Sequence, residues 1–237
     1  MPVTNIMKHS ILAAALTMSA LCVSPAGAQS AINWNGVYVG GYAGYAWSTN
    51  QGTDVGDSAG FPWRNIGERF SNKANGFTGG VQAGFNVQRG ALIWGLEADL
   101  GYLGIRGSGQ WSPYPDYIDT ASSFAATLRG RLGVASHNTL FYFTGGAIVA
   151  DLNNKVSLNN AQWESNFTGA QWGWTVGAGV EWALNAQWSL KTEYLYYSLG
   201  AENVATNNSC VTGDCYFKTN STGSIVRIGL NYRFAAP

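Results

Sequence analysis

Residues 76–88 read GFTGGVQAGFNVQ, and their side chains alternate without a break. One face carries only apolar residues and glycine, and the opposite face carries only glycine and polar residues. A repeat of two residues is the period of a β-strand, because successive side chains of a strand point to opposite faces. The same alternation returns over residues 124–135, where the polar face holds Arg129 and Arg131.

These two arginines separate two kinds of β-barrel. If the apolar face points inward, as in a lipocalin-like soluble carrier, the arginines belong to the solvent-exposed coat. If it points outward, the protein lies in lipid and its interior holds glycine, amides and paired charges. Charged residues make up 11% of the chain, less than half of the roughly 25% that is usual in soluble domains. The mean hydropathy is nevertheless −0.05. A lipid-facing barrel accounts for both values.

The first residues predict a secretory signal peptide. Lys8 precedes an apolar run at residues 11–23, and Pro25 and small residues follow, ending at Ala28. We predict cleavage after Ala28, which makes residues 1–28 the signal peptide and residues 29–237 the barrel domain. The whole chain has 13 basic and 13 acidic residues, so the loss of Lys8 leaves a net charge near −1. That balance gives no basis for binding nucleic acid.

Eight strand-like segments follow, and each has the ~9–11 residues that a tilted membrane strand requires. They are expected at residues 36–48, 76–88, 91–104, 124–136, 140–151, 171–182, 188–199 and 223–234. Short connections alternate with long polar ones, which are expected to be loops at residues 49–75, 105–123, 152–170 and 200–222. Outer-membrane barrels have short periplasmic turns and longer extracellular loops. The sequence therefore predicts an all-β fold, an eight-stranded antiparallel up-and-down transmembrane β-barrel with both termini in the periplasm.

Aromatic residues of the apolar phase gather near the strand ends, where a membrane protein places its two interfacial girdles. An ordinary apolar core would not sort its rings in this way. The periplasmic girdle is predicted to contain Phe85, Trp94, Trp182, Trp188, Tyr232 and Phe234. The outer girdle is predicted to contain Tyr45, Trp47, Phe77, Tyr102, Trp172, Trp174 and Tyr196.

The opposite phase collects charged residues, which we predict to face the lumen. They are Glu97, Asp99, Arg129, Arg131, Glu181, Lys191, Glu193, Arg227 and Arg233. An eight-stranded barrel is only wide enough for its own side chains, so these four acids and five bases are expected to pair as a structural plug. The alternative is a charge-lined pore or proton path. Inward glycines such as Gly101 and Gly179 are expected to make room for the long arginine and glutamate side chains.

Two cysteines remain after the signal peptide, Cys210 and Cys215, separated by four residues in a polar stretch. In an oxidising periplasm we expect them to form a structural disulfide. The alternative is a redox or metal site, although one pair without a nearby histidine is a poor metal cage.

Four stretches resemble a known family. Residues 34–41 (WNGVYVGG), 130–133 (GRLG), 142–146 (YFTGG) and 227–234 (RIGLNYRF) are similar to those of the small outer-membrane β-barrel proteins of alphaproteobacteria, porin-like surface proteins related to the OmpA-type transmembrane barrel. The resemblance implies insertion by the outer-membrane assembly machinery. It also implies an assembly signal in the last strand, at Leu230, Tyr232 and Phe234, which this chain follows with three further residues, 235–237.

We expect no enzyme activity, no catalytic residue, no cofactor and no metal site. The histidine that remains after the signal peptide, His137, lies in a predicted periplasmic turn, and no sequence motif of the main hydrolase or nucleotide-binding classes occurs. The leading hypothesis is a structural, surface-exposed protein of a Gram-negative outer membrane that supports envelope integrity. Its expected partners are outer-membrane lipids, lipopolysaccharide and the assembly machinery, with a possible host or surface ligand at the loops.

Two other hypotheses remain open. The first is a narrow porin that passes small solutes. The second is an adhesin or host-recognition protein and surface antigen, suggested by aromatic residues in the polar connections. These residues are Trp63, Trp111, Tyr114, Tyr117 and Trp163.

Overall fold

The computed structural model describes residues 32–57, 67, 69–111, 116–158, 163–205 and 215–234. The chain divides into two units, residues 1–30 and 31–237, and every described residue belongs to the second. The expected signal peptide and its cleavage after Ala28 lie outside the described residues and stay predictions. No helix that is long and apolar enough to cross a membrane occurs in the described part of the chain.

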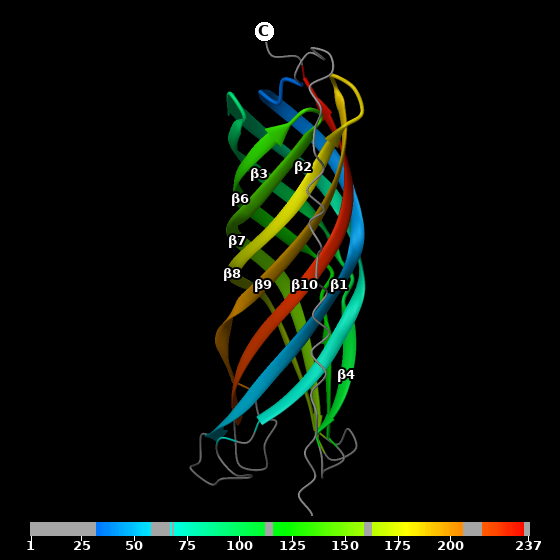
Figure 1. Cartoon of the computed structure of the whole chain (residues 1–237). Helices are drawn as coiled ribbons and strands as arrows, with labels where there is room; N and C mark the ends of the chain where they lie inside the picture. Colours follow the sequence, from blue (N-terminus) through cyan, green and yellow to red (C-terminus); the bar gives the residue numbers. More distant parts are fainter. Residues whose placement is uncertain are drawn as a thin grey trace, which may run out of the picture. The chain divides into compact units, whose positions relative to one another are not determined.

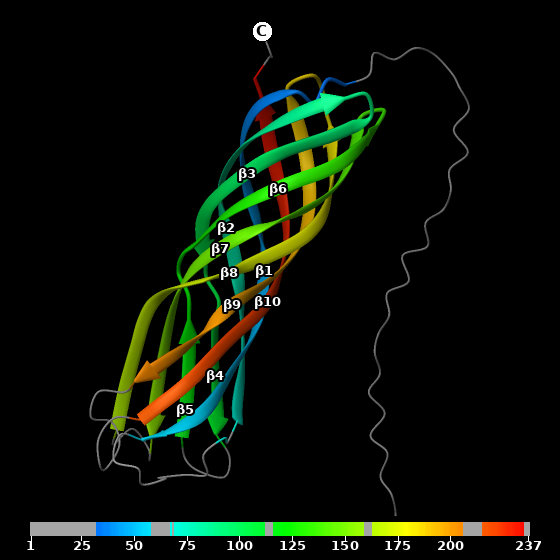
Figure 2. The same cartoon turned by 90° about the vertical axis from the view of Figure 1, so that its left-hand side faces the viewer.

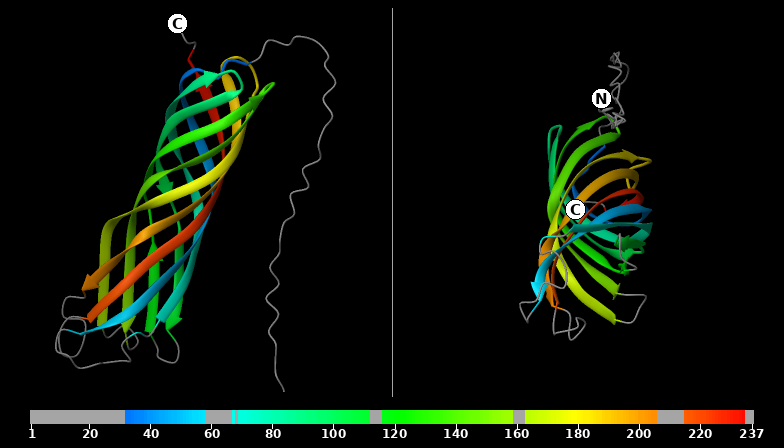
Figure 3. Two further views of the ribbon diagram at one scale, coloured as in Figure 1. Left: turned by 60° about the vertical axis from the view of Figure 1, so that its left-hand side comes forward. Right: turned by 90° about the horizontal axis from the view of Figure 1, so that it is seen from below.

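The described residues form ten β-strands in a single antiparallel sheet (Figure 1). The strands are β1 Gly36–Asp57, β2 Arg69–Arg89, β3 Leu92–Leu103, β4 Arg106–Trp111, β5 Asp116–Ala121, β6 Ala125–Ser136, β7 Thr139–Leu158, β8 Trp163–Ala183, β9 Trp188–Ala205 and β10 Cys215–Arg233. Strand β1 pairs with β2 on one side and with β10 on the other, so the sheet closes into a barrel. Figure 3 shows the first strand (blue) and the last strand (red) side by side.

Ten strands make eight positions around the barrel, because two positions are interrupted. Strand β2 pairs with β3 and then with β4, while β7 pairs with β6 and then with β5. Strands β3 and β4 therefore occupy one position of the barrel, and β5 and β6 occupy another. The predicted eight-stranded antiparallel up-and-down barrel is confirmed.

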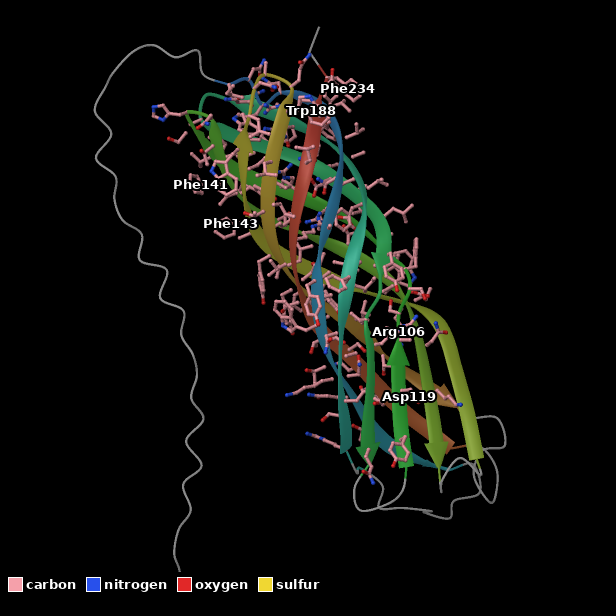
Figure 4. All side chains as sticks on the ribbon, turned by 90° about the vertical axis from the view of Figure 1, so that its right-hand side faces the viewer. Arg106, Asp119, Phe141, Phe143, Trp188 and Phe234 are labelled. Carbon is pink, nitrogen blue, oxygen red and sulfur yellow. The ribbon has the colours of Figure 1, made fainter. Side chains whose placement is uncertain are left out.

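Side chains alternate across the barrel wall as the sequence predicts, with the apolar phase outside. Along β7, Phe141 and Phe143 are exposed, the latter by 74%, whereas Tyr142 and Ile148 are buried. Figure 4 shows both phenylalanines projecting from the outer face of the wall. A soluble barrel would reverse this arrangement, so the lipocalin-like alternative is wrong.

The strands are longer than predicted at the end of the long connections. Much of the expected loops at residues 49–75, 152–170 and 200–222 is strand, and the expected loop at 105–123 contains β4 and β5. Figure 2 shows β4 and β5 in the half of the wall far from the end of β10. The prediction was wrong because the outward face of these segments is polar, as at Arg69, Lys73 and Lys218, which resembles a loop in sequence, while their backbone groups remain paired across the sheet.

The interruption between β5 and β6 has a local cause in Asp151 of β7. One carboxylate oxygen, Oδ1, accepts hydrogen bonds from the backbone nitrogens of Ser123 at 2.9 Å and Phe124 at 2.6 Å, and from the Ser122 hydroxyl at 3.1 Å. The carboxylate therefore supplies the acceptor for the backbone nitrogens of Ser123 and Phe124, whereas the backbone nitrogen of Ser122 donates to the carbonyl oxygen of Ile105. Backbone donors without a partner are costly in a barrel wall, so Asp151 makes the interruption possible.

Tight turns connect the strands at the opposite end. Gly90 has φ of 61° between β2 and β3, and His137 has φ of 56° between β6 and β7. In the turn between β8 and β9, the Asn185 side chain accepts hydrogen bonds from the backbone nitrogens of Gln187 and Trp188 at 2.9 and 2.8 Å. These short connections match the predicted periplasmic turns of an outer-membrane barrel.

Candidate functional site

Eight of the nine charged residues that the sequence assigns to the lumen meet in one buried network. They come from β3, β6, β8, β9 and β10, and at most 7% of each residue is exposed. Their positions follow from the strand period, because each occupies the phase opposite to the lipid-facing side chains. The network contains Glu97, Asp99, Arg129, Arg131, Glu181, Lys191, Glu193 and Arg227.

Arg129 of β6 contacts three carboxylates at once. Its Nη2 lies 2.5 Å from Glu97 Oε1 and 2.7 Å from Asp99 Oδ2, while its Nη1 lies 3.1 Å from Glu193 Oε1. Its remaining donor, Nε, bonds to the Thr127 hydroxyl at 2.9 Å. The planar guanidinium group thus joins acids from β3 and β9 across the lumen, which a lysine could not do with the same geometry.

Glu97 of β3 is the corresponding anionic centre. Lys191 Nζ lies 2.9 and 2.8 Å from its two carboxylate oxygens, and the Tyr38 hydroxyl donates to Oε2 at 2.7 Å. Arg131 Nη1 lies 3.5 Å from the same oxygen. Glu97 therefore has several donors around it, as a fully buried carboxylate requires.

Two further arginines complete the network. Arg227 of β10 places Nη2 2.6 Å from Glu193 Oε2 and 3.1 Å from Asp99 Oδ2. Arg131 of β6 places Nη2 2.7 Å from Glu181 Oε2. Four acids thus face four bases, so the formal charges of the network cancel.

Three tyrosines support the network, and the sequence interpretation missed them. The Arg131 guanidinium lies 4.0 Å from the Tyr142 ring centre, Arg227 lies 4.4 Å from that of Tyr42, and the Tyr142 hydroxyl donates to Glu193 at 2.9 Å. Tyr38 accepts a hydrogen bond from Arg131 at 2.6 Å. The signal was present in β1, where Tyr38 and Tyr42 share the phase of the inward glycines.

Inward glycines make room for these rings as well as for the long charged side chains that the sequence predicts. A methyl group at Gly44 would lie 2.8 Å from Cβ of Arg227. One at Gly179 would overlap Tyr142, and one at Gly101 would lie 2.6 Å from the Tyr42 hydroxyl. These rings come from other strands of the sheet, so the phase along a single strand does not predict this packing.

Apolar side chains fill the lumen on both sides of the charges. Along β3 the inward order is Ile93, then Glu97 and Asp99, then Leu103. The cluster near the tight turns consists of Trp34, Ile93, Leu140, Tyr142 and Ala183. The cluster toward the long connections consists of Ala46, Ala74, Leu103, Ile105, Ile148, Ala150, Leu152, Leu195, Tyr197, Leu199 and Ile225. The charged layer therefore lies between two apolar clusters, which share the lumen with buried polar residues such as Asn86 and Gln171.

Arg233 is the predicted lumen charge that does not join the network. It is buried, but its guanidinium group lies over the Trp34 ring at 4.2 Å, and Nη2 reaches the backbone oxygen of Asn185 at 3.4 Å. No carboxylate among the described residues pairs with it. It is the last inward position of β10, beyond the reach of the central acids.

The structure describes only some of the other residues to which the sequence assigns a role. Leu230 and Phe234 are exposed on the lipid face, and the Tyr232 ring packs against Trp188 and Phe234 with ring centres 5.1 and 5.3 Å apart. Cys210 lies outside the described residues, and Cys215 begins β10 without a described side chain, so the disulfide stays a prediction. Among the aromatic residues predicted for the connections, Tyr117 is exposed on β5. The described residues do not include the side chains of Trp63, Trp111, Tyr114 and Trp163.

The described residues contain no group of three or more histidine, cysteine or acidic side chains that could hold a metal ion. His137 is exposed in its turn, 3.3 Å from the Ser136 hydroxyl. The outer wall has a groove of about 740 Å³ where Gly41, Ala83 and Ala98 lie between larger apolar residues. Its lining suits acyl chains rather than a polar substrate.

Comparisons with known proteins agree with this architecture. A family model described as "Outer membrane protein beta-barrel domain" matches residues 13–234. The "31 kDa outer-membrane immunogenic protein" of Brucella melitensis is 32% identical over 243 residues, covering 95% of this chain and 94% of that protein. The "22 kDa outer membrane protein" of Rhizobium leguminosarum is 30% identical over 178 residues, covering 73% of this chain and 66% of that protein. The outer membrane protein OprG of Pseudomonas aeruginosa has a similar structure, with a TM-score of 0.61, 14% identity and coverage of 87% of this chain and 100% of that one.

Proposed function

Because the chain belongs to the outer membrane protein beta-barrel family, we propose that it is a structural, surface-exposed protein that supports envelope integrity. The expected resemblance to small alphaproteobacterial outer-membrane barrels is confirmed, and the protein is localised to the outer membrane. The structural role goes beyond the family and the localisation, and the filled lumen is the observation that supports it.

A lumen filled in this way favours mechanical stability over transport. Arg129 and Glu97 tie β3, β6 and β9 together through the centre of the barrel. Apolar layers on both sides keep water away from these charges, which strengthens the ion pairs and opposes the entry of hydrated ions. The geometry therefore favours a closed, rigid barrel over the narrow porin that the sequence left open.

Deletion of the gene tests the structural role. We expect a deletion strain to become sensitive to detergents and bile salts, and the wild-type gene to restore resistance. A second strain that carries the Glu97→Gln variant should regain less resistance, provided that immunoblots show equal amounts in the outer membrane. A deletion strain as resistant as its parent would contradict the proposal.

Planar bilayers test the porin alternative directly. Refolded protein that shows a boiling-dependent shift in gel migration should give no stepwise conductance at high protein load. Discrete channels from the same folded sample would instead support the porin and reject the closed lumen. Glu193→Gln is a useful companion, because it removes an acid that Arg129 and Arg227 share in the centre of the plug.

An adhesive role is a second candidate at the end of the long connections. Tyr117 is 43% exposed on β5, beyond the outer girdle, and the Brucella relative is described as immunogenic. If this end binds a host surface, Tyr117→Ser should reduce the attachment of bacteria to host cells, while Phe143→Ser on the lipid face tests the specificity of the effect. Unchanged attachment by a deletion strain would reject this role.

We propose no enzyme activity for this barrel. The support is chemical: the exposed His137 lies at the turn end, and the buried acids are each paired with bases. Incubation of the refolded protein with lipid and peptide substrates should give no turnover, and turnover that disappears in a His137→Ala variant would contradict this expectation.

A further inference from the structure

A set of basic side chains lies on the outer wall toward the long connections. We name it the basic band, and it consists of Arg69 and Lys73 on β2, Arg106 on β4 and Lys218 on β10. All four side chains are exposed. The structure shows no ion pair between any of them and another described residue. Their charges are therefore available to a partner outside the barrel.

The strand register places the four cations on one continuous surface. Thr53 of β1 pairs with Lys218 on one side and with Arg69 on the other, so these two residues are about 10 Å apart across three strands. Arg106 pairs with Asn75, which is two residues from Lys73 on the same face. Lys73 and Arg106 are thus diagonal neighbours, about 7–8 Å apart.

The basic band begins just beyond the outer aromatic girdle. Along the outer face of β2, Phe77 is 76% exposed, Asn75 follows, and Lys73 comes next. The Tyr45 hydroxyl donates to Asn75 at 2.6 Å, and the Tyr45 ring meets Phe77 at 5.4 Å between centres. Lys73 is therefore about 13 Å beyond Phe77 along the strand.

Aromatic girdles mark the boundary between lipid tails and water, so this position is the level of the lipid headgroups. Figure 4 shows Arg106 in the wall on the side far from Trp188 and Phe234, which belong to the opposite girdle. The basic band therefore faces one leaflet only.

Neither the lumen nor the described wall neutralises the band. The eight lumen charges cancel among themselves, so they provide no net negative charge beneath it. Among the exposed side chains that the structure describes, Asp119 of β5 is the acid. It is a diagonal neighbour of Arg106, whose register partner is Ala121, and it lies opposite Lys155 of β7, but it forms no ion pair with a cation of the band. Four exposed cations against one exposed acid, among the side chains described, predict an anionic partner outside the barrel.

We propose that the basic band binds the phosphate groups of the glycolipid that forms the outer leaflet, lipopolysaccharide. Arginine can form two parallel hydrogen bonds to a phosphate, and lysine contributes a compact charge. The apolar outer wall below the band is available to the acyl chains of the same lipopolysaccharide molecule. The inference rests on the orientation used in the proposed function, with the long connections at the cell surface.

Native mass spectrometry of the refolded, detergent-solubilised chain tests this binding with purified bisphosphorylated lipid A as the probe. The main variant combines Arg69→Gln, Lys73→Gln, Arg106→Gln and Lys218→Gln, and a double variant with Lys73→Gln and Arg106→Gln serves if the quadruple variant does not fold. Arg89→Gln is the matched control, because Arg89 is an exposed base at the tight-turn end. The boiling-dependent gel shift verifies the fold of each protein.

We expect each lost cation to weaken binding by about fivefold, and added salt to weaken wild-type binding. Arg89→Gln should bind as the wild type does, and lipid A without phosphates should bind weakly. Equal binding of the two lipids, or unchanged affinity in the quadruple variant, would overturn the proposal. Competition by inorganic phosphate as strong as that by lipid A would reassign the site to free anions. Because the measurement uses purified protein, its outcome is independent of the envelope phenotype that tests the structural role.

Discussion

Asp151 shows how one side chain can determine the course of a strand. Its carboxylate accepts three hydrogen bonds at the interruption between β5 and β6, two of them from backbone nitrogens. We expect Asp151→Ala to lower the free energy of unfolding by about 1–3 kcal/mol, because it leaves these donors without their partner. Urea unfolding in lipid vesicles, followed by tryptophan fluorescence, measures the difference. Asp119→Ala is the control, since this exposed acid has no such contact, and equal effects of the two changes would contradict the explanation.

His137 is a second residue whose backbone makes a clear prediction. Its φ of 56° lies in the left-handed region, which disfavours side chains with a Cβ atom. We expect His137→Gly to raise the free energy of unfolding by up to about 1 kcal/mol, with part of the gain offset by the freer unfolded chain. The neighbouring Asn138→Gly change should give no gain, because Asn138 does not have a positive φ. The same unfolding assay compares them, and a stabilised Asn138→Gly protein would argue against backbone strain as the cause.

At the scale of the element, sequence alternation predicts strands only where the two faces differ in polarity. Within the lipid belt they do differ, as at Phe143 and Thr144, and the predicted strands and their orientation are confirmed there. Beyond the belt the outward face is polar, so residues 49–57 and 69–75 were predicted as loops although they belong to β1 and β2. Hydrogen bonds between strands, which depend on a distant partner, extend the wall in these segments.

The last strand carries the prediction that comes from the family resemblance. Phe234 follows β10 and is exposed on the lipid face, and its ring packs against Tyr232. If Phe234 belongs to an assembly signal, Phe234→Ala should reduce the amount of folded protein in the outer membrane several-fold while refolding in detergent is unchanged. Phe143→Ala is matched in residue type and lipid exposure, but it lies on β7 and should assemble normally. Equal losses in both variants would indicate a general effect of removing a lipid-facing ring.

At the scale of the whole molecule, the sequence identified the charges of the lumen but not their partners. Phase alone assigns Glu97 and Arg129 to the interior, because their strands alternate clearly. Phase cannot show that Arg233 is too far along its strand to reach an acid, since that depends on the stagger of β10 against its neighbours. The tyrosines were missed because only aromatic residues of the apolar phase were assigned a place, and those of the inward phase were left without one.

The final prediction concerns the structural plug in the lumen, because its four acids and four bases cancel only when all of them are present. Glu97→Gln removes the anion that Lys191 and three arginines contact, and we expect it to lower the free energy of unfolding by about 3–5 kcal/mol. Lys191→Met should also destabilise the barrel. The double variant should cost clearly less than the sum of the two single changes, because it removes one acid and one base together.

Urea unfolding in vesicles of the wild type, the two single variants and the double variant measures the coupling between Glu97 and Lys191. Arg233→Gln is the control, because Arg233 lies outside the network, and combining it with Glu97→Gln should give additive effects. If the Glu97 and Lys191 changes are also additive, the charges act independently and the lumen is not a coupled plug. If they couple as expected, the ion pairs hold the barrel together from its centre, and such a barrel is suited to a load-bearing role in the envelope.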